Sequence, residues 1–192
     1  LLGSRAYREP SRSPLLPHRI LRAGILAAAL LLPQAAAAEV NESLQRGDYP
    51  AALAEARPLA EAGDPNAQAV MGLLYRDGLG VAQDYAQAAR WFEAACEQGQ
   101  AGAQYNLGEL YRRGSGVPQD YQQAAYWLWQ ASEQGHASAR FVLGYLYFEG
   151  RGVEPDGTRA LALIRSAAGA GVADAQGYPL AQGLADELEK GQ

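Results

Sequence analysis

Few side chains in this sequence could carry out nucleophilic or acid–base chemistry. After residue 38 the chain contains one histidine, His136, one cysteine, Cys96, and one lysine, Lys190. A nucleophile paired with histidine could use only His136, which lies in the short segment GHA directly after a glycine. No S-x-x-K motif surrounds Lys190, so serine hydrolase chemistry of that type has no motif here. The sequence therefore predicts no catalytic residues, and we expect His136 to be a solvated turn residue.

Metal, cofactor and phosphate sites also lack their motifs. Histidine and cysteine do not occur at ligand spacing, so we expect no metal and no cofactor. Three G-x-G-V segments lack the lysine and the further glycine of a phosphate-binding loop. Acidic residues recur at Asp84, Asp120 and Asp156, each directly before a segment with helical periodicity, where a carboxylate caps a helix N-terminus. We therefore predict a structural role for these three carboxylates.

The elements that would position these residues repeat every 36 residues along the chain. The clearest columns of identical residues are Gly72, Gly108 and Gly144; Tyr75, Tyr111 and Tyr147; Gly78, Gly114 and Gly150; Gly80, Gly116 and Gly152; Asp84, Asp120 and Asp156; and Gly99, Gly135 and Gly171. A fixed period of about 20 to 50 residues is the sequence signature of a stacked repeat fold. Cys96 shares its column with Ser132 and Ala168, so we expect it to be a small buried side chain.

Each copy predicts two helices joined by a glycine-rich turn. In the first copy apolar residues recur every three or four positions over residues 65–77 and again over 84–98. The glycines between these segments suit a turn that needs positive φ. Gln87 and Gln123, three residues after their aspartates, predict reciprocal capping boxes. The glycine that closes each copy predicts the end of the second helix.

The first two copies resemble the Sel1-like repeat, a relative of the tetratricopeptide repeat. The residues that carry this resemblance are MGLLYRDGLGVAQDYAQAARWFEAACEQG and LGELYRRGSGVPQDYQQAAYWLWQASEQG, and the similarity extends over about residues 65–172. The resemblance implies an all-α fold, an α-solenoid of antiparallel helix pairs whose first helices line the concave side. It also implies a scaffold that binds other proteins rather than one particular activity.

The register of the repeat sets the expected domain boundaries. The three repeats are residues 65–100, 101–136 and 137–172. Residues 39–64 keep the register of a lone second helix, so we expect an N-terminal half-repeat there. In residues 173–192 Pro179 would break a first helix, and a leucine stripe from Leu180 to Leu188 predicts a short C-terminal capping helix that faces repeat three.

Residues 1–38 have the features of an export signal. A basic stretch precedes an apolar run over 23–32, and small residues follow up to a predicted cleavage site after Ala38. The run is shorter than the roughly 20 residues that span a bilayer. Twin arginines and a cysteine near the cleavage site are lacking, so we expect Sec-type export to the periplasm or outside the cell, with no stable membrane insertion after cleavage. The chain opens with Leu1 and its single methionine is Met71, which leaves the translation start open.

The part of the chain after the predicted signal is acidic. Residues 39–192 carry a net charge of −9, while five arginines lie in the first 38 residues. An acidic surface repels phosphate backbones and lacks the clustered basic face that binds nucleic acid. We therefore expect no nucleic acid as a partner, while the resemblance to the Sel1-like repeat implies a protein or peptide partner.

Candidate binding residues are the positions at which one repeat departs from its siblings. Phe148 occupies the column of Arg76 and Arg112, and Tyr145 occupies a column that also holds Glu109. Charged siblings predict exposed columns, so we expect an exposed aromatic pair on the first helix of repeat three. The expected neighbours on repeat two are Asn106, Glu109, Arg112 and Arg113. Aromatic residues beside arginines have the composition of binding hot spots.

A second departure falls on the second helix of repeat two, which the resemblance places on the convex side. Trp129 replaces a glutamate and an arginine, and Tyr126 replaces an arginine and an alanine. For both aromatic clusters an alternative role is packing under the C-terminal cap or over neighbouring helices.

Two functions fit these residues. The first is an exported adaptor that holds a peptide or protein segment on its concave face, with no enzymatic activity. The alternative is a cell-envelope hydrolase of the β-lactamase type or a peptidoglycan-binding protein, because exposed aromatic rings can stack on sugars. The shortage of catalytic residue types argues against the hydrolase.

Overall fold

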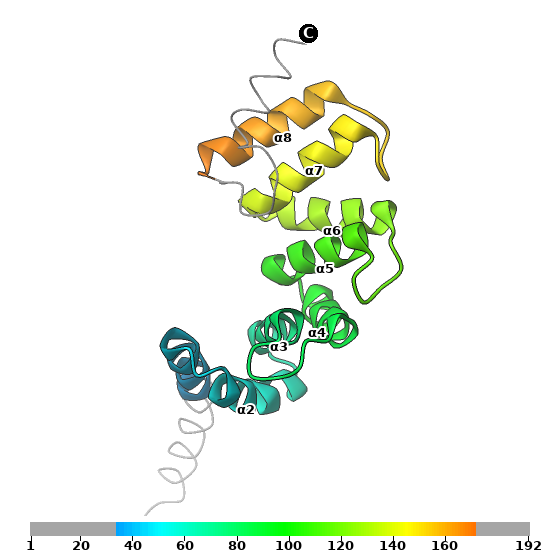
Figure 1. The fold of residues 1–192 in the computed structure, drawn as a ribbon. Helices are drawn as coiled ribbons and strands as arrows, with labels where there is room; N and C mark the ends of the chain where they lie inside the picture. Colours follow the sequence, from blue (N-terminus) through cyan, green and yellow to red (C-terminus); the bar gives the residue numbers. More distant parts are fainter. Residues whose placement is uncertain (1–33, 172–192) are drawn as a thin grey trace, which may run out of the picture. The chain divides into compact units, whose positions relative to one another are not determined.

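The computed structural model describes residues 34–171, and within this range every regular element is an α-helix (Figure 1). The chain divides into two compact units, Leu1–Ala35 and Ala36–Gln192, and the labelled helices belong to the second. They are α2 (Tyr49–Glu61), α3 (Pro65–Asp77), α4 (Tyr85–Glu97), α5 (Ala101–Arg113), α6 (Tyr121–Glu133), α7 (Ala137–Glu149) and α8 (Gly157–Gly169). Residues 1–33 of the predicted export signal and the predicted cap at 173–192 lie outside the described residues.

The helices pack in pairs that follow the 36-residue period. Within each repeat α3 packs on α4, α5 on α6 and α7 on α8, and successive pairs meet where α4 contacts α5 and α6 contacts α7. The predicted all-α arrangement of stacked helix pairs is confirmed. We call the contact between the repeats 65–100 and 101–136 the first junction, and the contact between the repeats 101–136 and 137–172 the second junction.

Each second helix begins at a capping aspartate, as the sequence predicts. Asp84 Oδ1 accepts hydrogen bonds from the backbone N–H groups of Ala86 and Gln87, both at 2.9 Å. Asp120 accepts the two equivalent bonds at 2.9 and 3.0 Å, and Asp156 accepts one at 2.9 Å. These bonds use N–H groups that have no partner inside the first turn of a helix.

The reciprocal capping boxes predicted for Gln87 and Gln123 are not formed, so that prediction was wrong. In a capping box the glutamine side chain bonds the backbone N–H of the capping residue. Here the N–H of Asp84 donates to the carbonyl oxygen of Tyr75, and the N–H of Asp120 donates to that of Tyr111, both at 2.9 Å. Because the turn folds back on the first helix, a carbonyl oxygen of that helix accepts the hydrogen bond from this N–H in place of the glutamine side chain.

A second capping column did not stand out in the sequence. Asp64, Gln100 and His136 are 36 residues apart and precede α3, α5 and α7, and each side chain accepts a hydrogen bond from the N–H three residues further on. The three side chains share an acceptor atom but no residue type. A comparison of identical residues therefore does not find them.

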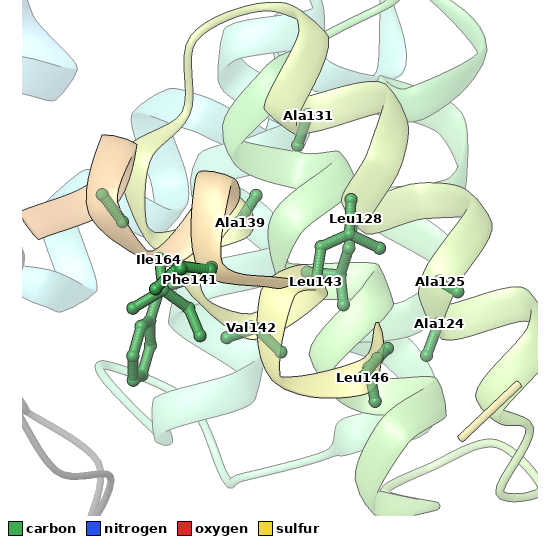
Figure 2. Packing of buried hydrophobic residues seen from close by; sticks show 12 residues of the cluster. Ala124, Ala125, Leu128, Ala131, Ala139, Phe141, Val142, Leu143, Leu146 and Ile164 are labelled. Atoms are coloured by element: carbon green, nitrogen blue, oxygen red, sulfur yellow. The ribbon is translucent and has the colours of Figure 1, made fainter. Parts of the chain in front are cut away.

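Glycine lets the two helices of each repeat approach closely. A Cβ atom on Gly108 of α5 would lie 2.8 Å from Leu128 Cγ, and one on Gly144 of α7 would lie 2.9 Å from Ile164 Cγ1. Figure 2 shows the resulting core of repeat three, where Leu143 and Leu146 of α7 lie with Leu128 of α6 and Ile164 of α8. All four of these side chains are fully buried.

The glycine-rich turns also bring successive repeats together. Gly80 has a φ of 69°, and a Cβ there would lie 2.6 Å from the carbonyl carbon of Tyr49 at the start of α2. Gly116 and Gly152 approach the equivalent peptide groups, at Tyr85 and Tyr121, in the same way. Glycine is therefore required at this column for two reasons, a left-handed backbone and contact with the preceding repeat.

The N-terminal half-repeat differs from its prediction as a lone second helix. A helix over residues 34–46 precedes α2, and its side chains Val40 and Ser43 are buried. Val40 packs into a cluster with Ala56, Ala60 and Met71. The sequence comparison missed this helix because it lacks the glycine-rich turn of the later repeats and passes to α2 through Gly47 and Asp48. The predicted cleavage site after Ala38 falls inside this helix.

Candidate functional site

A polar pocket lies between the first helices of repeats one and two. It has a volume of about 350 Å³ and combines the end of α3 with the exposed side of α5. Its lining residues are Arg76, Asp77, Tyr85, Tyr105, Asn106, Glu109, Leu110, Arg113 and Ser115. Three of the predicted binding residues, Asn106, Glu109 and Arg113, are therefore brought together in one pocket.

Charged side chains pair with one another around this pocket. The Arg76 guanidinium contacts both carboxylate oxygens of Asp77, at 2.7 and 2.6 Å, and donates to Asn106 Oδ1 of the next repeat. Asn106 in turn donates from Nδ2 to the carbonyl oxygen of Gly102 at 2.7 Å. The hydrogen bond with Asp77 is the main cause that raises the pKa of Arg76. The Arg76 guanidinium and the Asn106 side-chain amide are thus held in fixed orientations.

Glu109 differs from its expected exposure. The residue is only 7% exposed, although a charged residue in this column predicts exposure. Arg112 and Arg113 both bind its carboxylate, at 2.7 and 2.9 Å. A carboxylate that accepts several charge-assisted bonds tolerates burial. Glu109 therefore orients the two arginines and presents little surface of its own.

The predicted aromatic pair lies on α7, one repeat further along. The rings of Tyr145 and Phe148 are 6.4 Å apart between centroids, within the usual range for aromatic contact. Phe148 is 46% exposed and Tyr145 is half-buried. A hydrogen bond with Glu149, followed by burial, raises the pKa of the Tyr145 hydroxyl, and the charges of Arg151 and Arg112 oppose this rise.

The second aromatic cluster lies apart from the first, on α6. Tyr126 and Trp129 are 48% and 47% exposed. The Tyr126 ring packs edge-on against Trp127 at 4.9 Å, and its hydroxyl accepts a hydrogen bond from Gln130 at 3.3 Å. Trp129 forms one wall of a smaller pocket of about 190 Å³ next to α7 and α8. The eight predicted residues therefore fall on two surfaces, one on the first helices and one on a second helix.

Comparison with known proteins now identifies the helix pairs. The family model described as Sel1 repeat matches residues 65–100, 101–136 and 137–172, more than half of the chain. The chain belongs to the Sel1 repeat family. Proteins built from Sel1 repeats generally mediate protein–protein interactions. No curated protein sequence matches the chain.

Solved structures of other Sel1 repeat proteins resemble this chain. A Sel1 repeat protein from Oxalobacter formigenes is 36% identical with a TM-score of 0.66, over 70% of this chain and 53% of its own. A protective antigen present in uropathogenic Escherichia coli strains, which displays an SLR fold, is 34% identical with a TM-score of 0.66, over 71% of this chain and 31% of its own. This chain therefore matches about half of the first relative and about a third of the second.

A more distant likeness extends along most of a smaller relative. The Helicobacter pylori cysteine rich protein B is 20% identical with a TM-score of 0.50, over 76% of this chain and 94% of its own. Identity at this level shows the shared fold alone.

The two reactive residue types in the Sel1 repeats have structural roles. His136 is half-buried rather than a solvated turn residue, because its Nδ1 caps α7 by accepting the N–H of Ala139 at 3.2 Å and its ring stacks on Tyr105 at 4.6 Å. This burial lowers the pKa of the imidazole below its usual 6.5. Cys96 is a buried free thiol, and burial raises its pKa to about 12. The prediction of a small buried cysteine is confirmed.

Two further observations concern only part of the chain. Within residues 34–171 no group of three or more histidine, cysteine, aspartate or glutamate side chains is placed to hold a metal ion. No helix in the same range is both long enough and apolar enough to cross a membrane.

The comparison of repeats also missed pocket residues. Arg76 and Tyr85 line the polar pocket, yet each is identical to its sibling in repeat two, Arg112 and Tyr121. The available signal was the next repeat, because Asn106 is the partner of Arg76 and has an apolar residue, Val142, as its own sibling. The change at Asn106 thus gives a new hydrogen-bond partner to Arg76, a residue 30 positions earlier that is identical to its sibling in repeat two.

Proposed function

We propose that this chain is an exported adaptor that binds a protein or peptide segment on the surface formed by α3, α5 and α7. The observation that carries the proposal is the exposed ring of Phe148 beside Tyr145, in a column where the sibling repeats have arginine. The polar pocket on the same helices adds oriented hydrogen-bonding groups. Membership of a family that mediates protein–protein interactions supports the same conclusion.

The surface has the two components of a binding site. Large aromatic side chains supply apolar contact area at low conformational entropy, and Arg112 and Arg113 supply charged donors nearby. Both arginines are already oriented by the buried carboxylate of Glu109. Preorganised side chains lose less entropy when a partner binds, which favours affinity.

A binding role without catalysis is consistent with the state of the candidate nucleophile and base. The raised pKa of Cys96 keeps the thiol protonated at neutral pH, whereas the thiolate is the nucleophilic form. The Nδ1 atom of His136 is used by a backbone N–H, so it is not free to accept a proton from a substrate. We therefore propose that neither residue does chemistry.

Export rests on the N-terminal sequence. The basic stretch, the apolar run over 23–32 and the alanines before residue 39 support cleavage by a signal peptidase and release into the periplasm or the medium. Cleavage after Ala38 leaves Val40 and Ser43, the buried residues of the first helix, in the mature chain. Fractionation followed by intact mass tests this directly. A full-length protein recovered in the cytoplasm would contradict export.

Affinity purification from crosslinked cell envelopes tests the adaptor. We expect a specific protein to be recovered with the exported wild-type chain and lost with Tyr145→Ala/Phe148→Ala, while circular dichroism stays unchanged. Tyr126→Ala, which removes an exposed ring from α6, is the matched control and should retain the protein. Equal recovery with both variants would disprove the proposed surface. Recovery of peptidoglycan alone would favour the wall-binding alternative.

A further inference from the structure

Three columns meet wherever one helix pair packs on the next. The first column lies on the second helix of the leading repeat and contains Arg57, Glu93 and Trp129. The second lies on the following first helix and contains Tyr75, Tyr111 and Tyr147. The third lies on the following second helix and contains Trp91, Trp127 and Leu163. Each set of three residues is 36 positions from the next, so the contacts can be compared directly.

The contact between α2 and repeat one and the first junction share two features. In each, a polar residue of the first column lies near the tyrosine of the second column, and the third column holds a tryptophan. Arg57 Nη2 donates to the Tyr75 hydroxyl at 3.3 Å. Burial, followed by the nearby charge of Glu93, raises the pKa of the Tyr111 hydroxyl. In both places an indole from the third column packs against buried core residues. Trp91 does so at the contact between α2 and repeat one, and Trp127 does so at the first junction. A polar side chain and a large indole ring therefore lie between the helices at both places.

At the second junction both features change. Trp129 replaces the polar residue of the first column, so the Tyr147 hydroxyl accepts a hydrogen bond from Arg159 at 2.9 Å instead. Leu163 replaces the indole of the third column and is smaller. A pocket of about 190 Å³ lies at this position, lined by Trp129, Ser132, Glu133, Leu143, Tyr147, Arg159 and Leu163.

We propose that this pocket binds an aromatic side chain, of the size of tryptophan, from a partner protein. The other two contacts supply the argument, because at each of them an indole of this chain, in the column of Leu163, packs against the buried core. The volume is below the roughly 300–1,000 Å³ of sites for drug-sized ligands, which suits a single side chain. Trp129 and Leu163 provide apolar walls, and the exposed face of Trp129 can stack on an entering ring.

The rim of the pocket suits the polar edge of such a ring. Glu133 can accept an indole N–H or a tyrosine hydroxyl, and Arg159 lies beside Tyr147, 5.0 Å from its ring centroid. Aromatic anchors surrounded by polar residues are typical of protein interfaces. The identity of the ligand as a protein side chain rests on the proposed adaptor function. The pocket itself lies at α6, α7 and α8, apart from the surface of Phe148.

Titration with N-acetyl-tryptophanamide, followed by ligand-observed NMR and calorimetry, tests the pocket. We expect saturable binding with a Kd of about 1 mM to the wild type. Trp129→Ala should weaken it at least about tenfold. Leu163→Trp, which restores the sibling residue, should abolish it while the Tm stays equal or rises. Tyr126→Ala, an exposed ring on the same helix outside the pocket, is the control and should bind as the wild type.

Several results would overturn the inference. They are the absence of saturable binding, equal binding to Trp129→Ala, or displacement of the probe by N-acetylglucosamine at a lower concentration, which would make the pocket a sugar site. Trp129 is exposed, so its alanine variant stays informative even if Leu163→Trp fails to fold. The titration does not involve Tyr145 or Phe148. Failure here and failure of the adaptor surface are therefore distinguishable.

Discussion

The two junctions between the three repeats share one backbone plan and differ in where they leave space. At the first junction the polar pocket lies between the first helices α3 and α5, while Trp127 packs on the side of the second helices. At the second junction the equivalents of Tyr105 and Asn106 are buried apolar residues, Phe141 and Val142, and the pocket lies beside α6 and α8 instead. Residues outside the shared columns therefore decide which side of a junction can accept a ligand.

The shared columns explain why such variation is tolerated. The approach of Gly116 to Tyr85 and that of Gly152 to Tyr121 involve backbone atoms, and the capping bonds of Asp120 and Asp156 also end on the backbone. This part of the contact between repeats therefore does not depend on which side chains fill the remaining space. In a repeat fold each unit contacts only its neighbours, so a change at one junction leaves the other intact.

The largest effect is expected where the two junctions are alike. Gly116→Ala and Gly152→Ala should each lower the free energy of unfolding by about 3 kcal/mol or more, because a Cβ meets a rigid peptide group and the φ is 72° at both sites. Thermal unfolding followed by circular dichroism measures both. Gly99→Ala is the matched control, since its φ is 79° but nothing lies within 4 Å, and it should lose only about 1 kcal/mol. Equal losses at all three sites would show that the contact between repeats does not matter.

A smaller effect is expected where the junctions differ. Trp127→Leu gives the first junction the residue that the second junction has, and should lower stability by about 1–2 kcal/mol because Trp127 is only half-buried. Glu93→Trp added to this variant should create a second binding site for N-acetyl-tryptophanamide. Calorimetry would then show a stoichiometry of two. A stoichiometry that stays at one would mean that the columns compared here do not define the pocket.

The sequence predicts the fold well because its evidence is local and repeated. Identical glycines and aspartates at Gly116, Gly152, Asp120 and Asp156 mark backbone positions, and backbone requirements can be satisfied by few residue types. The capping column of Asp64, Gln100 and His136 shows the limit of this approach. There the requirement is for an acceptor atom, which three different side chains supply.

The candidate surfaces are predicted less well because they depend on partners far away in the sequence. A charged residue normally indicates exposure, but the buried state of Glu109 depends on its two arginine partners. The pocket beside Trp129 depends on Leu163, which lies 34 positions later in the sequence. A comparison within one column does not show that these two residues line the same pocket. The repeat register becomes informative for such sites once the structure gives the offsets between contacting columns.

The smallest effect concerns His136, which caps α7 at the second junction where Gln100 caps α5 at the first. Burial lowers the pKa of the folded imidazole, so the unfolded chain binds a proton more readily. The stabilising contribution is complete above the unfolded pKa near 6.5 and is lost as the pH falls from there through the folded pKa. His136→Gln keeps a capping acceptor but does not titrate. The Tm of the wild type should therefore fall more than that of the variant between pH 7.5 and 5.5, by about 2 °C or less because the site is partly solvated. Parallel curves for the two proteins would mean that the protonated imidazole is accommodated in the folded cap, and the two junctions would then be equally insensitive to pH.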